Sequence, residues 1–434
     1  MKSVLINFGI RVLSAGLVFL LQVLLARVMD LDGYGNYVTM WTALIALGSF
    51  GALGFGESSV RFLPRYRARG REAHVTEYWR FGLWVVVVGS VLMAFAAAAL
   101  AWAIGTDESW GTIALFVALG LPFFAIEYYL DGICRSLGWI QLTSIAGFIA
   151  RPLLIGAMAL GCLWLGIPIT LPVIGIIITG TLAAIAVFMV GAIAWRLKSN
   201  PKVRLRLRRV TPREAMWIKA SAPMLLVTGL EDILTSSDVL MLSVLMTPHD
   251  VGIYFAAART LALANFVYFA MWTVAGRGFA LAFEDTDRAR LQETILETTR
   301  LTFWCTVAAL IATLTAAPVF LYAFGPEFLG GIGVVAVLAV GLLVRSLTGQ
   351  AAEVLIVTGK QKESVALIGG VLAVNVAITL ALVPLFGVYG AALGSAAALA
   401  ARSAAIVYTV RRTLGLRVVS LGLPKAVLSR LRPV

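Results

Sequence analysis

Long apolar stretches separated by short polar connections make up most of this 434-residue chain. A helix needs about 20 apolar residues to cross the hydrocarbon core of a bilayer. Windows of that kind predict twelve spans, at 4–27, 36–60, 80–104, 110–130, 140–165, 169–195, 215–246, 251–275, 300–324, 331–358, 364–386 and 388–411. We expect every span to be helical, because a segment in lipid must satisfy its backbone hydrogen bonds internally.

The first apolar stretch could be mistaken for a secretion signal, since Lys2 precedes it. It runs to about Ala26, however, which is too long for the apolar region of a signal peptide, and no small-residue cleavage site closes it. We therefore expect a retained first span.

Charged residues lie mainly in the connections and alternate from one side to the other. The chain is 60% hydrophobic and 13% charged, with a net charge of +13. A soluble protein carries about a quarter charged residues, and a nucleic-acid-binding protein would not place its positive charge in alternate short loops. Because basic loops face the cytoplasm, the pattern predicts that both termini and the basic loops are cytoplasmic.

The longest basic connection, 196–213, divides the chain into two halves of six spans each. We expect lobes at 1–195 and 214–411, followed by a basic tail at 412–434. Short motifs recur between the halves: Gly35-Asn36-Tyr37 matches Gly252-Ile253-Tyr254 at an offset of 217, which is half the chain. With an even number of spans in each half, the repeats would run parallel.

Five arginines lie inside the predicted spans, where a charge costs about 2.5 kcal/mol or more and usually faces a polar cavity or a partner. They are Arg11, Arg151, Arg259, Arg345 and Arg402. Arginine can bind phosphate in a bidentate manner, which lysine cannot. The set therefore favours a cationic, hydrated interior that holds an anionic, phosphate-bearing cargo.

Other roles for these arginines stay open. Arg151 and Arg345 lie near the middle of their spans, where the headgroups are hard to reach. Arg11 and Arg402 lie near span ends and could extend to the headgroups. Arg151 could instead form a structural ion pair with Glu127 or Asp131.

Two polar stripes mark the first and seventh spans. Asn7, Arg11, Ser14 and Gln22 follow one side of the first helix, and Thr228, Glu231, Thr235 and Asp238 follow one side of the seventh, with Asp232 and Ser236 beside them. The offset of 217 places Thr228 over Arg11 and Glu231 over Ser14, so the two stripes lie on equivalent faces. We expect both helices to line a central cavity, although such stripes can also hold helices together by hydrogen bonds.

Cofactor chemistry is not indicated by any motif. The chain has two histidines, its three cysteines lack metal-ligand spacing, and no phosphate-binding loop is present. We expect no cofactor, no metal centre and no nucleic acid partner. Energy for transport would come from an ion gradient, the membrane potential or the gradient of the substrate.

The segment from Ala26-Arg27 through Gly33-Tyr34-Gly35-Asn36-Tyr37 resembles the end of the first span in the polysaccharide transporter (Wzx-like flippase) family. Gly51, Gly54-Phe55-Gly56 and Ser59-Val60-Arg61-Phe62 resemble the second helix of that family. The family belongs to the multidrug/oligosaccharidyl-lipid/polysaccharide exporter superfamily. The resemblance also covers the length of the chain, its twelve spans and its duplication.

This resemblance implies an all-α integral membrane protein with twelve transmembrane helices, in two parallel-repeat six-helix lobes around a central cavity. It implies a flippase of the bacterial cytoplasmic membrane that moves a polyprenyl-pyrophosphate-linked oligosaccharide by alternating access, for lipopolysaccharide or exopolysaccharide synthesis. Arg11 and Arg259 would hold the diphosphate, Arg345 and Arg151 would assist, and Asn7 and Ser14 would line the site. Glu231, Asp232 and Asp238 would couple a cation, either a proton or sodium.

Two alternatives remain open. A cation-coupled multidrug exporter of the same fold would also place acids in its cavity. A polytopic polysaccharide polymerase or ligase would need an outward-facing catalytic surface, and no predicted outer loop exceeds about ten residues. We therefore expect a transporter rather than an enzyme.

Overall fold

The computed structural model describes residues 2–104, 108–197, 211–265, 268, 288–351, 361–420 and 422. These residues form helices joined by short turns, with no strand among them, so the expected all-α class is confirmed. The chain divides into two compact units, Met1–Ser236 and Ser237–Val434, which we call unit 1 and unit 2. The boundary lies inside a helix rather than in the basic 196–213 segment, most of which lies outside the described residues.

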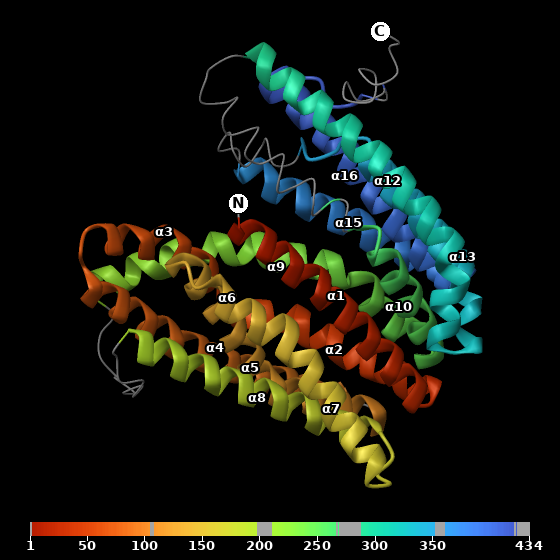
Figure 1. Ribbon diagram of the computed structural model, residues 1–434, viewed down its shortest axis with the longest axis horizontal. Coiled ribbons are helices and arrows are strands. Elements are labelled where there is room, and N and C mark those ends of the chain that lie inside the picture. Colours follow the sequence, from red (N-terminus) through yellow and green to blue (C-terminus); the bar gives the residue numbers. More distant parts are fainter. Residues whose placement is uncertain are drawn as a thin grey trace. The chain divides into compact units, whose positions relative to one another are not determined.

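Unit 1 is a bundle in which several helices pack around α5 (Glu108–Leu137) (Figure 1). Helices α2, α3, α4 and α8 all contact α5, whereas α1 packs on α7 and on the π-helical turn that precedes it. The other elements of this unit are α1 (Lys2–Val28), α2 (Leu31–Gly51), α3 (Phe55–Ala68), α4 (Glu72–Ile104), α6 (Ile140–Thr143), η1 (Ser144–Ala150), α7 (Arg151–Trp164), α8 (Leu171–Arg196) and most of α9 (Pro212–Leu245).

Unit 2 holds the end of α9 and the helices that follow it. Helix α16 packs against both α13 and α15, and α12 runs alongside α13 (Figure 1). The elements are α10 (Pro248–Ala262), α12 (Arg288–Phe324), the 3-10 turn η2 (Pro326–Gly331), α13 (Ile332–Ser346), α15 (Gln361–Phe386) and α16 (Val388–Leu414).

Eight helices in the described part of the chain are long and apolar enough to cross a membrane, or nine if one bent pair forms a single span. The described apolar part of α1, Leu13–Val28, is shorter. Helix α9 is long enough, but it carries three carboxylates in its second half. The chain is therefore a multi-pass membrane protein, with up to nine of the twelve predicted spans recognisable by length and composition in that part.

The predicted span 36–60 is broken in the structure. Helices α2 and α3 meet at an angle of 43°. Leu53, with φ of 50°, and Gly54, with φ of 70°, adopt left-handed conformations at the break. A Cβ atom at Gly54 would lie 2.3 Å from the backbone oxygen of Ser221, so only glycine lets α3 begin this close to α9. The sequence pattern missed the break because membrane helices contain glycine often.

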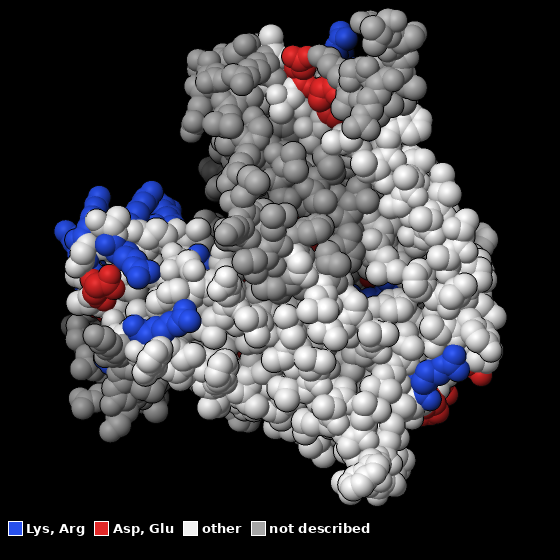
Figure 2. All heavy atoms as spheres, in the orientation of Figure 1, with Lys and Arg blue, Asp and Glu red and all other residues white. Residues whose placement is uncertain are grey.

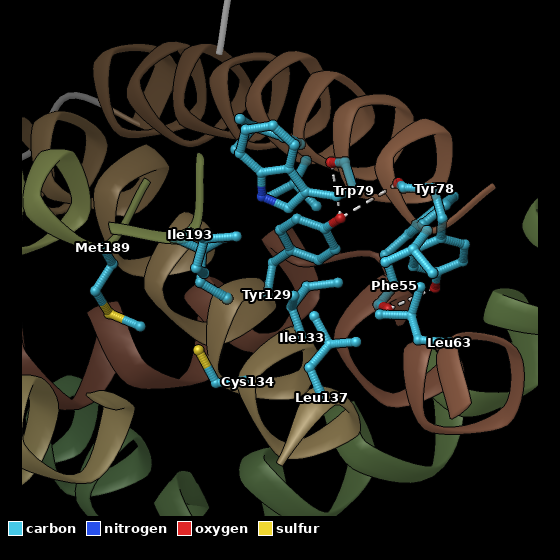
Figure 3. Packing of buried hydrophobic residues seen from close by; sticks show 14 of the residues in the cluster. Phe55, Leu63, Tyr78, Trp79, Tyr129, Ile133, Cys134, Leu137, Met189 and Ile193 are labelled. Atoms are coloured by element: carbon cyan, nitrogen blue, oxygen red, sulfur yellow. Dashed lines mark hydrogen bonds between the residues drawn. The ribbon is translucent and has the colours of Figure 1, made fainter. Parts of the chain in front are cut away.

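Aromatic packing holds α3, α4 and α5 together in the core of unit 1 (Figure 3). The Tyr129 hydroxyl donates to the backbone oxygen of Trp79 at 2.9 Å, and the Tyr78 hydroxyl donates to that of Phe55 at 2.8 Å. Trp217, from the start of α9, joins this cluster, and its ring N–H donates to the Tyr66 hydroxyl at 3.0 Å. These polar contacts fix the register of the helices, which burial alone does not.

Basic side chains gather at the end of unit 1 where α3 leads into α4 (Figure 2). Five arginines there are exposed: Arg61, Arg65, Arg67, Arg69 and Arg71. We call them the basic turn. Elsewhere, uncharged side chains make up most of the described surface visible in Figure 2, as expected for helices that contact lipid.

Candidate functional site

Arg151 forms an ion pair with Glu127 inside unit 1, which answers one question that the sequence left open. The Nη2 atom of Arg151 contacts the Oε2 atom of Glu127. Asp131, the other candidate partner, binds Arg135 at 2.9 Å and accepts a hydrogen bond from Thr143 at 2.6 Å. The pair joins α5 to α7.

Two aromatic rings flank this ion pair. The Arg151 guanidinium carbon lies 5.5 Å from the ring centre of Phe124 and 6.0 Å from that of Trp41. Within a desolvated site such cation–π contacts contribute about 2 kcal/mol. The Glu127 side chain is 5% exposed and that of Arg151 is 19% exposed. Glu127 is therefore enclosed, whereas part of the Arg151 side chain is exposed.

Only one contact joins the two charged groups, and the site is incompletely satisfied. The Oε1 atom of Glu127 and the Nε atom of Arg151 are both buried, and neither has a hydrogen-bond partner. A complete arginine–carboxylate pair would use two parallel hydrogen bonds. The pair thus retains one buried donor and one buried acceptor without partners.

The local backbone explains how a charge is presented within an apolar span. The π-helical turn η1 ends at Ala150, directly before Arg151, and Pro152 follows in the first turn of α7. Single π-helical turns inside α-helices are frequent at functional sites because they change the direction of the side chains that follow.

Arg259 and Arg345 belong to unit 2, and each lies against an aromatic ring. Arg259, near the end of α10, is 4.5 Å from the Phe255 ring centre. Arg345 is 4.3 Å from the Tyr268 ring centre. Arg345 lies in the last turn of α13, not in the middle of a long span as expected. Both arginines and Arg402 on α16 are half-buried.

The stripe predicted on the first helix is described in part. Asn7 and Arg11 lie on α1, but their side chains are outside the described residues. Ser14 is buried. The Gln22 amide nitrogen donates to the Tyr37 hydroxyl at 2.9 Å, and its oxygen accepts from Tyr34 at 3.2 Å. For Gln22 the structural alternative, a link between helices, is the one the contacts support.

The acids of α9 separate into two environments. Asp232, which belongs to unit 1, accepts a hydrogen bond from Tyr128 at 3.3 Å, and Glu231 beside it is half-buried. Asp238, which belongs to unit 2, accepts from Tyr254 at 2.5 Å and from Ser395 at 3.2 Å. The sequence grouped these acids on one helix without showing that they have partners in different units.

Tyr254 and Ser395 were not singled out as functional residues from the sequence. Tyr254 ends the repeated motif Gly252-Ile253-Tyr254, and its counterpart Tyr37 also bonds a polar side chain of the preceding helix. The repeat therefore contained the signal for Tyr254. Nothing in the sequence near Ser395 distinguishes it from other small residues of α16. Among the described residues, no group of three or more acids, histidines or cysteines could hold a metal ion.

Comparison with solved structures shows the fold. A multidrug resistance MATE family transporter of the MOP superfamily, in an inward-facing conformation, superimposes with a TM-score of 0.74 at 14% identity, covering 92% of this chain and 94% of the other. The lipid II flippase MurJ, in an inward closed conformation, gives 0.72 at 13% identity, covering 94% and 87%. A MOP superfamily transporter from Pyrococcus furiosus, whose binding pocket is described as having reversed polarity, gives 0.65 at 14% identity, covering 94% and 93%.

Comparison with curated proteins found no match. At the level of sequence families, the polysaccharide biosynthesis protein family matches residues 1–275, which is more than half of the chain and includes all of unit 1. With its helical transporter fold and its multi-pass character, this chain belongs to the polysaccharide biosynthesis protein family.

Proposed function

We propose that the protein is a flippase that moves a polyprenyl-pyrophosphate-linked oligosaccharide across the bacterial cytoplasmic membrane by alternating access. The observation that carries this proposal is the family match over residues 1–275. The fold adds support, because it is shared with a lipid II flippase. The lipid tail would remain in the bilayer, so the protein would enclose only the charged and sugar portions.

The arginines supply the chemistry that such a headgroup needs. Arg151, Arg259 and Arg345 are half-buried within apolar helices, and each guanidinium lies against at least one aromatic ring. A charge in an apolar span costs free energy, so a charged residue retained there is a candidate for a functional role. Arg11 and Arg259 would hold the diphosphate, with Arg345 and Arg151 assisting and with Asn7 and Ser14 nearby on α1.

Coupling would depend on the acids of α9. Asp238 is held by two hydroxyl donors inside an apolar bundle, so its charge is sensitive to binding of a proton or sodium. Asp232 and Glu231 would respond in the same way in unit 1. With the basic turn on the cytoplasmic side, the substrate would enter from the leaflet where lipid-linked sugars are made.

Reconstitution tests the proposal directly. A fluorescent lipid-linked oligosaccharide is placed in proteoliposomes, and a quencher is added outside. Molecules in the inner leaflet are protected from the quencher, so movement to the outer leaflet is measured as an increase in the quenched fraction of the fluorescence. We expect an Arg11→Ala/Arg259→Ala double variant to lose at least tenfold in flipping rate. Arg61→Ala, which removes an exposed arginine of the basic turn, is the matched control and should flip normally. Normal flipping by the double variant would refute the assigned roles.

The second candidate function is a cation-coupled multidrug exporter. Glu231, Asp232 and Asp238 favour it, because carboxylates suit cationic drugs, and the solved structures of similar fold include a multidrug transporter. The same proteoliposomes separate the two functions. Accumulation of a lipophilic cationic dye, with no movement of the lipid-linked sugar, would favour the exporter.

A further inference from the structure

Glu127 is paired with the guanidinium of Arg151, a group that we expect to bind a phosphate. It holds Arg151 through a single contact between Oε2 and Nη2, while Oε1 and Nε stay buried without partners. Each buried polar atom left without a hydrogen bond costs about 1–3 kcal/mol. Arginine–carboxylate pairs frequently form two parallel hydrogen bonds, and this pair does not.

The surroundings leave Arg151 free to accept another anion. Trp41 and Phe124 lie beside the guanidinium and would keep a cation in place whichever anion it binds, because their rings attract the charge without consuming N–H donors. The side chain of Arg151 is 19% exposed, against 5% for Glu127, so Arg151 is the more accessible member of the pair.

We propose that Glu127 acts as an internal substitute for phosphate, which holds Arg151 in the unloaded protein until the diphosphate of the substrate replaces it. This inference rests on the proposed function and deepens it by assigning a role to Glu127. A phosphate can take both N–H groups of one guanidinium edge, which the single contact with Glu127 does not. The exchange therefore satisfies the Nε donor that is buried without a partner in the unloaded state.

Competition also provides for release. Once Arg151 has turned to the diphosphate, Glu127 remains as a buried carboxylate without its cation, which is costly. That cost limits the affinity for the headgroup and favours re-formation of the ion pair as the substrate leaves. Without it, a cluster of arginines would bind a diphosphate too tightly for rapid turnover.

The test measures binding and flipping separately. A polyprenyl pyrophosphate that carries no sugar is titrated into the protein in nanodiscs, with the uncharged polyprenol as a comparison lipid. Glu127→Gln keeps the shape and removes the competing charge, so we expect it to bind the diphosphate lipid about tenfold more tightly and to flip substrate more slowly. Binding of the polyprenol should not change.

Glu57→Gln is the matched control. Glu57 contacts Arg135 at 2.7 Å in the same unit, and Arg135 keeps its second partner, Asp131. This variant should bind like the wild type. A neutral pair, Arg151→Gln/Glu127→Gln, avoids a buried unpaired charge and should bind more weakly than Glu127→Gln alone. Thermal unfolding confirms that each variant is folded.

Equal or weaker binding by folded Glu127→Gln would overturn the inference and leave the ion pair a structural link between α5 and α7. The proposed function fails by a different result, namely absence of flipping by the wild type. Tighter diphosphate binding by Glu127→Gln together with a wild type that flips nothing would retain the exchange and reject the flippase.

Discussion

At the residue scale, Asp238 is the acid whose environment is most sharply defined. Its carboxylate accepts from the Tyr254 hydroxyl at 2.5 Å, from the Ser395 hydroxyl at 3.2 Å and from its neighbour's backbone N–H, that of Val239, at 2.9 Å. Three donors stabilise one charge within an apolar bundle, so loss of the charge changes what the bundle can bind.

Asp238→Asn should therefore separate folding from coupling. Both hydroxyls can rotate to accept from the new amide, so we expect the variant to fold with a lowered melting temperature. We expect flipping to proceed but no longer to be accelerated by an imposed proton or sodium gradient. Flipping is measured in proteoliposomes with and without each gradient.

Asp32→Asn is the matched control for this experiment. Asp32 lies exposed in the first turn of α2. It should respond to the gradient like the wild type. If Asp238→Asn kept the full acceleration, Asp238 would have no part in coupling.

Individual charged residues were partly predictable from the sequence. A charged residue inside an apolar stretch is visible in the sequence as a candidate site residue, and Arg151 and Asp238 are predicted in this way. The partner of Arg151 was harder to predict. Glu127 and Asp131 lie four residues apart on one face of α5, so the sequence pattern favours both equally as the partner. Only the position of α7 relative to α5 decides between them.

At the scale of elements, the turn between α2 and α3 shows where glycine is required by contact as well as by conformation. Gly54 and Gly70 have similar φ values, 70° and 65°. A Cβ at Gly54 would meet the backbone of Ser221 at 2.3 Å, whereas one at Gly70 would meet nothing within 4 Å. The two positions therefore form a matched pair.

Alanine at each position should separate these two effects. Gly70→Ala should lower the free energy of unfolding only by the cost of placing alanine in the left-handed conformation, about 1–2 kcal/mol. Gly54→Ala incurs the same cost and in addition overpacking against α9, about 1–3 kcal/mol. Unfolding of both variants in detergent measures the difference, and equal destabilisation would show that α3 and α9 do not approach so closely.

Six of the twelve predicted spans match described helices within about three residues at both ends, because a lipid environment requires long apolar runs that are visible in the sequence. The exceptions have local causes. The predicted span 331–358 extends past the end of α13 at Ser346, and its last residues, 352–358, lie outside the described residues. Hydropathy measures composition, and it does not register a helix end made within an apolar run.

At the scale of the whole molecule, the division into two units follows packing rather than loop charge. The Trp217 cluster binds the start of α9 to unit 1, and the bonds of Asp238 bind its end to unit 2. A basic connection signals orientation, and no charge pattern reveals that the helix after it contributes to both units. The expected lobes at 1–195 and 214–411 stay a prediction, because most of the 196–213 connection between them lies outside the described residues.

The orientation of the whole chain is testable through its charge asymmetry. Exposed arginines of the basic turn and exposed Asp32 at the start of α2 are separated by one helical passage, the bent pair α2 and α3. Because positive loops are retained in the cytoplasm, we expect Arg69→Cys to react with a membrane-impermeant thiol reagent only after cells are permeabilised. We expect Asp32→Cys to react in intact cells.

The native cysteines determine how this experiment is built. Cys162 and Cys305 are half-buried and could react, so both are replaced by alanine, whereas Cys134 is fully buried in the core of unit 1 and can stay. That background protein must remain unlabelled in intact and in permeabilised cells. Labelling of Arg69→Cys in intact cells would show that the protein has the opposite orientation in the membrane. The basic turn would then face away from the leaflet where lipid-linked sugars are assembled, and the proposed direction of transport would fail.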